Sequence, residues 1–401
     1  MTRRRFLRAG SVTLLCACTG PARSFSEGLR PAAVSSGDDK APLLVVMFLR
    51  GGADGLHLVP PTGDPGYAAL RGALALPSPL PFVTGFGLHP ALEPLLPIAV
   101  RGDLAVVHAA GSPHSTRSHF EAQDFMEAGE PGTRHLHDGW LARALGGGAD
   151  ADPFASLAIA SQLPLSLRGT GSFALTDVAD FGVSAGTEAR AALAQLYAGP
   201  SRDPVVVAGR RALGAVADLE ARVGSRSRRG RARSRGAGER LVQSADQLLA
   251  VEGAGLPVHA ACLESGGWDT HANQGGETGQ MARWIADLAE AVARLDAGLR
   301  GRREYRLVVM TEFGRTVRPN GSGGTDHGHG SVMLVVGAGV RGGLHGDWRG
   351  LDASALYEGR DLPVTTDWRS VLSEVLTAHL GRRPPADTFP GHEPRSLGLF
   401  G

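Results

Sequence analysis

The chain has 401 residues, of which 42% are hydrophobic and 20% are charged. This composition is ordinary for a soluble globular protein and leaves room for one large domain or two small ones. The formal net charge of +1 gives no overall electrostatic field that would favour binding to nucleic acid or to an anionic membrane surface.

The N-terminal residues match the pattern of a twin-arginine export signal. The basic stretch Thr2–Arg8 is followed by a short apolar run from Ala9 to Cys18. That run is too short to span a bilayer, so we expect residues 1–30 to be a signal peptide and linker, with no integral membrane span after processing. The mature protein is then periplasmic or secreted, and its partner during delivery is the twin-arginine export machinery. Lipid anchoring at Cys18 is a less favoured alternative, because Cys16 is unusual in a lipoprotein cleavage box.

The first half of the mature chain begins with a buried strand. Leu43–Leu49 is continuously apolar, as expected for a strand covered on both faces, and it runs into a glycine-rich turn that presents Asp54. We expect a helix after Pro90 and a short strand at Leu104–His108. The segment from Ser156 to Tyr197 mixes short apolar runs with turns and gives no clear assignment.

The stretch from Arg222 to Arg240 is rich in arginine, serine and glycine and has no periodic apolar face. It is either a disordered surface insertion, a polyanion-binding arm or the product of a local frameshift, and we favour the insertion. We therefore expect residues 41–400 to form a single α/β domain with an irregular insertion around 198–250.

The last third of the chain carries the clearest fold signal. A strand at Pro257–Glu264, an amphipathic helix at Thr278–Leu299 and a strand at Arg306–Met310 form a βαβ unit, which predicts parallel strands. Ser331–Val336 adds a strand, and a further helix begins at Thr366 or Asp367 and is stopped by Gly381. The predicted fold class is α/β, with a mostly parallel central sheet flanked by helices.

Residues of the types that bind metals follow several of these strands. In an α/β sheet, ligands bind beyond the carboxyl ends of the strands, where such side chains can meet. Carboxylates and imidazoles suit zinc, manganese or iron, so we expect one or two divalent ions there. The candidate ligands are Asp54, Asp269, His271, Glu312, Asp326, His327 and His329.

Some of these assignments have alternatives. Asp54 could be an ordinary turn residue, and Glu312 could be the ion-pair partner of Arg315 instead of a ligand. At least one imidazole of the pair His327 and His329 is expected to bind the metal, but their spacing does not decide which one.

A hydroxyl-rich segment between a strand and an expected helix supplies a candidate nucleophile. Ser118 at a helix N-terminus could attack a phosphate or sulfate ester, because backbone N–H groups there hold an anion; the commoner role of such a serine is an N-cap. His119 could be a ligand, a base or a packing residue. Arg117 and Arg315 could stabilise developing negative charge.

These motifs together resemble a known family. The segments concerned are Phe48–Gly55, Arg117–Asp124, Gly266–His271, Thr311–Thr316, Thr325–Gly330, Tyr357–Asp361 and Thr366–Arg369. They are similar to those of the exported bacterial family catalogued as domain of unknown function 1501, over about residues 42–391, with Arg222–Arg240 as the clearest departure.

The motif order of that family in turn resembles the alkaline phosphatase and sulfatase superfamily, which includes cofactor-independent phosphoglycerate mutases. The resemblance implies an alkaline-phosphatase-like fold around two divalent metals. By order, Asp54 resembles the first-strand Asp, Ser118 the nucleophile, Asp269 and His271 the Asp/His pair, and His327 or His329 the late His. Where the superfamily has Asp-His this chain has Glu312-Phe313, and Phe313 cannot bind a metal.

The expected function is therefore that of an exported, metal-dependent hydrolase of phosphate or sulfate esters, acting on a small-molecule or polysaccharide ester. The alternative is a non-catalytic periplasmic binding or scaffold protein with a degenerate metal site. The loss of an imidazole at Phe313 favours the alternative, while the retained Asp269, His271, His327 and His329 favour the hydrolase.

Overall fold

The computed structural model describes residues 41–401 except for 134–135, 147–151, 170, 179–186 and 224–239. The expected signal peptide, Cys18 and nearly all of the arginine-rich stretch therefore lie outside the described residues. No helix in the described ranges is long and apolar enough to cross a membrane.

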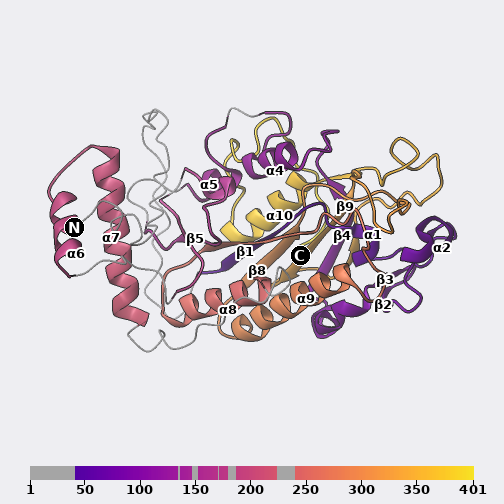
Figure 1. The fold of residues 1–401 in the computed structure, drawn as a ribbon, viewed down its shortest axis with the longest axis horizontal. Coiled ribbons are helices and arrows are strands. Elements are labelled where there is room, and N and C mark those ends of the chain that lie inside the picture. The colour runs from indigo at the N-terminus through magenta and orange to yellow at the C-terminus, as the bar shows by residue number, and fades with distance from the viewer. Residues whose placement is uncertain (1–40, 134–135, 147–151, 170, 179–186, 224–239) are drawn as a thin grey trace, which may run out of the picture.

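The described residues form a nine-stranded sheet with helices on both faces (Figure 1). The strands of the sheet are β1 Leu43–Arg50, β4 Leu104–Gly111, β5 Ser156–Ile159, β6 Phe173–Leu175, β7 Ala260–Gly266, β8 Tyr305–Met310, β9 Ser331–Gly337, β10 Gly343–His345 and β11 Thr366–Asp367. The order across the sheet is β10-β4-β9-β8-β1-β7-β5-β6, and β11 pairs with β4. A separate hairpin consists of β2 Leu80–Val83 and β3 Phe86–Leu88.

The helices vary widely in length. They are α1 Gly55–Leu58, α2 Tyr67–Arg71, α3 Leu96–Val100, α4 His119–Ala128, α5 Trp140–Leu145, α6 Thr187–Leu196, α7 Pro204–Val223, α8 Arg240–Gly253, α9 Gln280–Leu299 and α10 Trp368–Leu380. Three 3₁₀ turns complete the described elements: η2 Gly72–Leu74, η3 Pro90–Leu95 and η4 Leu165–Leu167.

The sheet is mixed, which corrects the expectation of a mostly parallel sheet. The βαβ unit is as predicted, since β7 and β8 both run parallel to β1, which lies between them. The error concerns β9, which is antiparallel to both β8 and β4. No helix separates β8 from β9 in the chain, and without a crossover helix the chain returns alongside β8 in the opposite direction.

Alternate residues of β1 face two different cores. Leu43, Val45 and Met47 pack into the core that contains the apolar faces of α8 and α9. Leu44 and Val46 point to the other face and pack with side chains of α5 and α10. Every residue of β1 up to Leu49 is buried, as a strand covered on both faces must be. The result is a three-layer α/β/α arrangement (Figure 1).

The two best-predicted helices end where the sequence signals placed them. The Asp367 side chain accepts a hydrogen bond from the backbone N–H of Arg369 and so caps α10, which stops at Gly381 in the left-handed conformation. In α9 the predicted apolar stripe, including Ile285 and Leu288, is fully buried against the sheet.

A buried histidine makes the fold sensitive to acid. His108 in β4 is 1% exposed and its Nε2–H donates to the Val59 carbonyl 3.1 Å away. Burial lowers the pKa of His108 from 6.5 to about 4. Between these values the unfolded chain binds a proton that the folded chain does not, so stability is lost as pH falls from about 6.5 to about 4.

We compare wild type with His108→Gln after removal of metal by a chelator. As pH falls through this interval, we expect the free energy of unfolding of wild type to decrease by up to about 3 kcal/mol more than that of His108→Gln. Glutamine keeps a hydrogen-bond donor for Val59 but does not titrate. Urea denaturation at pH 7 and pH 4.5 measures the difference, and equal losses in the two proteins would contradict the assignment.

Candidate metal centre

Four segments meet at the end of the sheet where β1, β7 and β8 finish. They are the turn after β1, the start of α4, the loop after β7 and the long loop between β8 and β9. Gly51 lets the turn after β1 pack closely against the backbone of the loop after β7. It has a φ of 121°, and a Cβ there would lie 2.6 Å from the Asp269 nitrogen.

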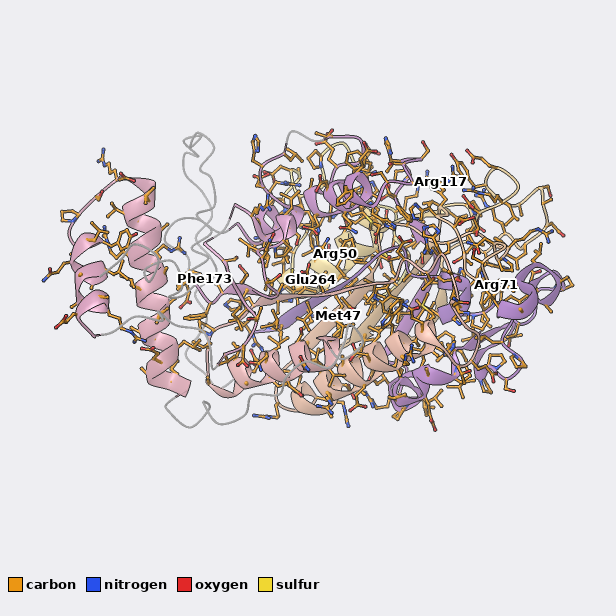
Figure 2. The ribbon with its side chains drawn as sticks, viewed as in Figure 1. Met47, Arg50, Arg71, Arg117, Phe173 and Glu264 are labelled. Atoms are coloured by element: carbon orange, nitrogen blue, oxygen red, sulfur yellow. The ribbon has the colours of Figure 1, made fainter. Side chains whose placement is uncertain are left out.

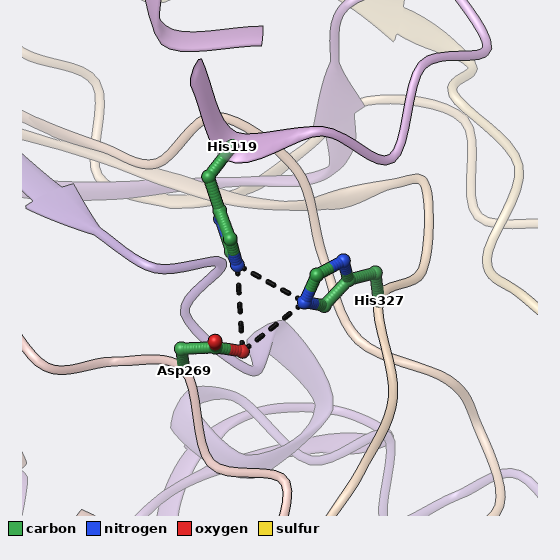
Figure 3. A group of neighbouring side chains, drawn as sticks. All are labelled: His119, Asp269 and His327. Atoms are coloured by element: carbon green, nitrogen blue, oxygen red, sulfur yellow. Dashed lines mark hydrogen bonds and ion pairs between the residues drawn. The ribbon is translucent and has the colours of Figure 1, made fainter. Parts of the chain in front are cut away.

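Three of the predicted residues form a compact group (Figure 3). His119 Nε2 lies 3.0 Å from His327 Nε2 and 3.4 Å from Asp269 Oδ1, and His327 Nε2 lies 3.2 Å from the same Asp269 oxygen. His271 Nε2 is next to this group, 3.0 Å from Asp269 Oδ1 and 2.9 Å from His327 Nε2. We call His119, Asp269, His271 and His327 the histidine–aspartate cluster.

The outer nitrogen of each imidazole faces an oxygen acceptor. His119 Nδ1 lies 2.7 Å from Glu312 Oε1, and His271 Nδ1 lies 3.0 Å from Asp326 Oδ1. His327 Nδ1 lies 2.8 Å from the backbone carbonyl of Arg117. In each ring the distance from Nδ1 to its oxygen acceptor is shorter than or equal to that from Nε2 to Asp269 Oδ1, which favours the tautomer with the N–H at Nδ1. A neutral ring in that tautomer carries its lone pair at Nε2.

In that tautomer the lone pairs of His119 and His327 and one Asp269 oxygen point toward a common region, and His271 Nε2 lies at its edge. With Nδ1 holding the proton, no hydrogen is left to bridge the short Nε2–Nε2 distances, and the lone pairs repel one another. A cation between them would turn this repulsion into coordination. Ligand atoms at about 2.0–2.1 Å from a tetrahedral zinc ion lie about 3.3–3.4 Å apart. The distances among His119, Asp269 and His327, 3.0, 3.2 and 3.4 Å, are close to this spacing. The residues present fit a divalent metal.

The Glu312 carboxylate contacts His119 at Nδ1, the ring nitrogen that faces away from the cluster. It is fully buried, and its Oε1 accepts hydrogen bonds from His119 Nδ1, from the Gly51 N–H at 2.8 Å and from Gln123 Nε2 at 2.8 Å. Burial alone would raise the pKa of Glu312, but the hydrogen bonds from His119 and Gln123 outweigh it and keep that pKa below its usual value. A carboxylate that orients a ligating imidazole in this way is common in metal sites.

Arg315 supports the carboxylate of the cluster. Its side chain is fully buried, and its Nη2 donates to Asp269 Oδ1 over 2.7 Å. Burial would raise the pKa of Asp269, and the charge of Arg315 more than offsets this and lowers it. Arg315 Nε and Nη1 are buried without a hydrogen-bond partner among the described residues, so Asp269 is the main partner of this guanidinium.

The segments that form the cluster lie within a stretch of the chain that matches a known protein family. The family model described as "Protein of unknown function (DUF1501)" matches residues 104–382, more than half of the chain. The chain belongs to the DUF1501 family. The matched span includes all four residues of the histidine–aspartate cluster and excludes Asp54. A search of curated proteins found no match.

In this DUF1501 protein, two carboxylates predicted as ligands have supporting positions instead. Glu312 neither joins the cluster nor pairs with Arg315, because it is hydrogen-bonded to His119. Asp326 binds the outer nitrogen of His271 and is itself held by Asn320 Nδ2 at 3.0 Å.

Asp54 is also outside the cluster. Its carboxylate is buried, caps α1, and forms an ion pair with Arg71 in which Arg71 Nη2 lies 2.5 Å from Asp54 Oδ2. Gln274 Nε2 donates to the same oxygen over 2.7 Å. The prediction of Asp54 as a ligand by its place after the first strand is therefore not matched by the geometry.

The structure separates His327 from His329. His327 is in the cluster, whereas His329 is buried and stacks on Tyr357 with ring centroids 4.4 Å apart. Phe313 is buried and stacks on His119, with the ring centroids 4.7 Å apart. The cluster therefore offers ligands for one ion.

The remaining predicted catalytic residues have distinct positions. Ser118 is the N-cap residue of α4, without a side-chain capping bond. The guanidinium of Arg117 (Figure 2) donates hydrogen bonds to Glu358 and Asp361. The backbone carbonyl of Arg117 accepts a hydrogen bond from His327 Nδ1. Arg117 thus acts on the cluster through its backbone.

Two supporting residues were not predicted. Gln123 lies four residues after His119, one turn along α4, so the helical spacing could have indicated that both side chains share a face. Its Oε1 accepts from Arg50, which also pairs with Glu264 at 2.7 Å (Figure 2). Asn320 gave no signal, because it acts within an irregular loop.

Proposed function

We propose that this protein is an exported, metal-dependent hydrolase of phosphate or sulfate esters, with one divalent ion held by the histidine–aspartate cluster. The observation that carries the proposal is the convergence of the His119 and His327 imidazoles and the Asp269 carboxylate, with His271 beside them. Each of the four side chains is oriented by a hydrogen bond from outside the cluster. The likeness of the motif order to the alkaline phosphatase and sulfatase superfamily supports the choice of reaction.

In this proposal His119, His271, His327 and Asp269 would hold zinc, manganese or iron, all of which accept nitrogen and oxygen ligands. A bound ion would act as a Lewis acid toward an ester oxygen and make a hydroxyl or water more acidic. Glu312, Asp326 and the Arg117 carbonyl keep the three rings oriented. Arg315 holds Asp269 and adds a positive charge beside the region where negative charge develops.

Ser118 is the proposed nucleophile, with a water molecule as the alternative. It directly precedes His119 at the start of α4, so its backbone position is tied to that of a cluster residue. The unbonded N–H groups in the first turn of a helix favour an anion at that end. A serine ester intermediate would form in the Ser118 pathway and not in the water pathway.

A second candidate function is a non-catalytic binding protein with a reduced metal site. Phe313 is the specific observation in its favour, because it fills with an apolar ring the position of an imidazole in the two-metal enzymes that the motifs resemble. The engagement of Asp54 by Arg71 removes a further ligand of such a site.

Turnover separates the two functions. We expect the mature protein, loaded in turn with zinc, manganese or iron, to hydrolyse an aryl phosphate or aryl sulfate, and the double variant Asp269→Ala, His271→Ala to lose about 10³-fold or more in rate. Ser118→Ala should lose a comparable factor if Ser118 attacks and little if water does. Stoichiometric metal without turnover of either ester class would favour the binding protein.

The export part of the proposal is tested separately. Replacing Arg3 and Arg4 with lysine is expected to keep the protein in the cytoplasm, whereas the wild-type chain is delivered to the periplasm. Cell fractionation measures the two locations, and unchanged delivery of the variant would contradict twin-arginine export.

A further inference from the structure

A buried polar triad contacts the loops that carry the histidine–aspartate cluster. Its members are Arg71, Asp54 and Gln274, all at most 1% exposed. Asp54 Oδ2 accepts from Arg71 Nη2 at 2.5 Å and from Gln274 Nε2 at 2.7 Å. This contact fixes which end of the Gln274 amide faces Asp54, because the carboxylate accepts only from the NH₂ group.

The other end of the Gln274 amide binds two threonines. Gln274 Oε1 accepts from Thr270 Oγ1 at 2.9 Å and from Thr325 Oγ1 at 2.7 Å. Thr270 lies between the cluster residues Asp269 and His271. Thr325 precedes Asp326 and His327. One amide therefore joins the two loops that carry three of the four cluster residues.

The two loops also pack backbone to backbone at this point. The Thr325 N–H donates to the Thr270 carbonyl over 3.0 Å, and a Cβ on Gly324 would lie 2.2 Å from the same carbonyl oxygen. Arg71 extends the contact to the segment after Arg315, since its Nη1 donates to the Val317 carbonyl over 3.2 Å.

We propose that the Arg71–Asp54–Gln274 triad is the positioning element of the metal centre, and that it sets metal affinity by holding the Thr270 and Thr325 loops together. This inference rests on the proposed metal-binding function. It gives Asp54 a role that acts through Gln274 rather than by contact with the ion. The interactions that fix ligand loops commonly change metal affinity by 10–100-fold when they are removed.

Two variants test the proposal in the mature full-length protein. Gln274→Met keeps the side-chain length but removes both ends of the amide. Thr325→Val removes one hydroxyl with little change in shape, and Thr325→Ser keeps that hydroxyl. Leu248→Ala, a core substitution in α8 remote from the loops, controls for a general loss of stability.

Zinc affinity, measured by competition with a chromophoric chelator, is the readout. We expect Gln274→Met to bind zinc about 10–100-fold more weakly, Thr325→Val to be weakened in the same direction, and Thr325→Ser and Leu248→Ala to stay within about twofold of wild type. Wild-type affinity in both Gln274→Met and Thr325→Val would overturn the positioning role while leaving the metal centre intact. A wild-type protein that binds no zinc, manganese or iron would instead overturn the proposed function, and the positioning role with it.

Discussion

Replacing His327 with alanine is expected to weaken metal binding by more than about a hundredfold, while His329→Ala leaves it near the wild-type value. His327 Nε2 lies within 3.2 Å of His119 Nε2, His271 Nε2 and Asp269 Oδ1, so it contacts every other member of the cluster. A direct ligand should matter more than the supporting residues whose loss commonly costs 10–100-fold. His329 is two residues away, is buried and stacks on Tyr357.

The two histidine variants form a matched pair, because each removes one imidazole from the same loop. Chelator competition with zinc measures both affinities, and thermal unfolding with and without metal provides a second readout. We expect added zinc to raise the melting temperature of wild type and His329→Ala but not of His327→Ala. Equal affinities in the two variants, or a larger loss in His329→Ala, would contradict the assignment of His327.

Removing the charge of Glu312 is also expected to weaken metal binding. Glu312→Gln should weaken metal binding by about 10–100-fold. In wild type one Glu312 oxygen accepts from the Gly51 N–H, Gln123 Nε2 and His119 Nδ1. An amide is a weaker acceptor than a carboxylate and adds donors to a buried site already crowded with donors. We therefore also expect a loss of about 1–3 kcal/mol in the free energy of unfolding.

Glu264→Gln is the matched control for Glu312→Gln. Glu264 lies on the adjacent part of the sheet and pairs with Arg50, but its side chain is partly exposed and does not contact the cluster. We expect its metal affinity to match that of wild type. If Glu312→Gln binds metal as tightly as Glu264→Gln does, Glu312 has no part in orienting His119.

The sequence predicted several interior strands and the helices α9 and α10 because their burial leaves a strong pattern. It missed α7 and α8, which lie almost entirely within residues 198–250, where an irregular insertion was expected. Continuous apolar runs identified β1 and β8, and a seven-member apolar stripe identified α9. The sequence did not predict that β9 runs antiparallel to its neighbours. A strand buried on both faces has the same composition in a parallel or an antiparallel pair, and the direction depends on the path of the loop between β8 and β9.

The candidate site was predicted to the level of its loops but not of its individual contacts. Asp269, His271 and His327 were expected as ligands, and His119 was recognised with its role left open between ligand, base and packing. Asp54 and Glu312 have the right chemistry and follow strands, yet their neighbours decide their roles. Arg71 reaches Asp54 from α2, and His119 reaches Glu312 from α4. Each of these pairings joins a residue of a helix to a residue of a separate segment, and spacing along one segment does not reveal it.

The metal content of the purified protein tests most directly whether the histidine–aspartate cluster binds an ion. The wild-type protein and the double variant Asp269→Ala, His271→Ala would be purified in the folded state and their metals measured by mass spectrometry. We expect close to one zinc, manganese or iron ion per wild-type chain and almost none in the variant. Wild-type protein that holds no metal and matches the variant in thermal stability would contradict a metal centre at the histidine–aspartate cluster.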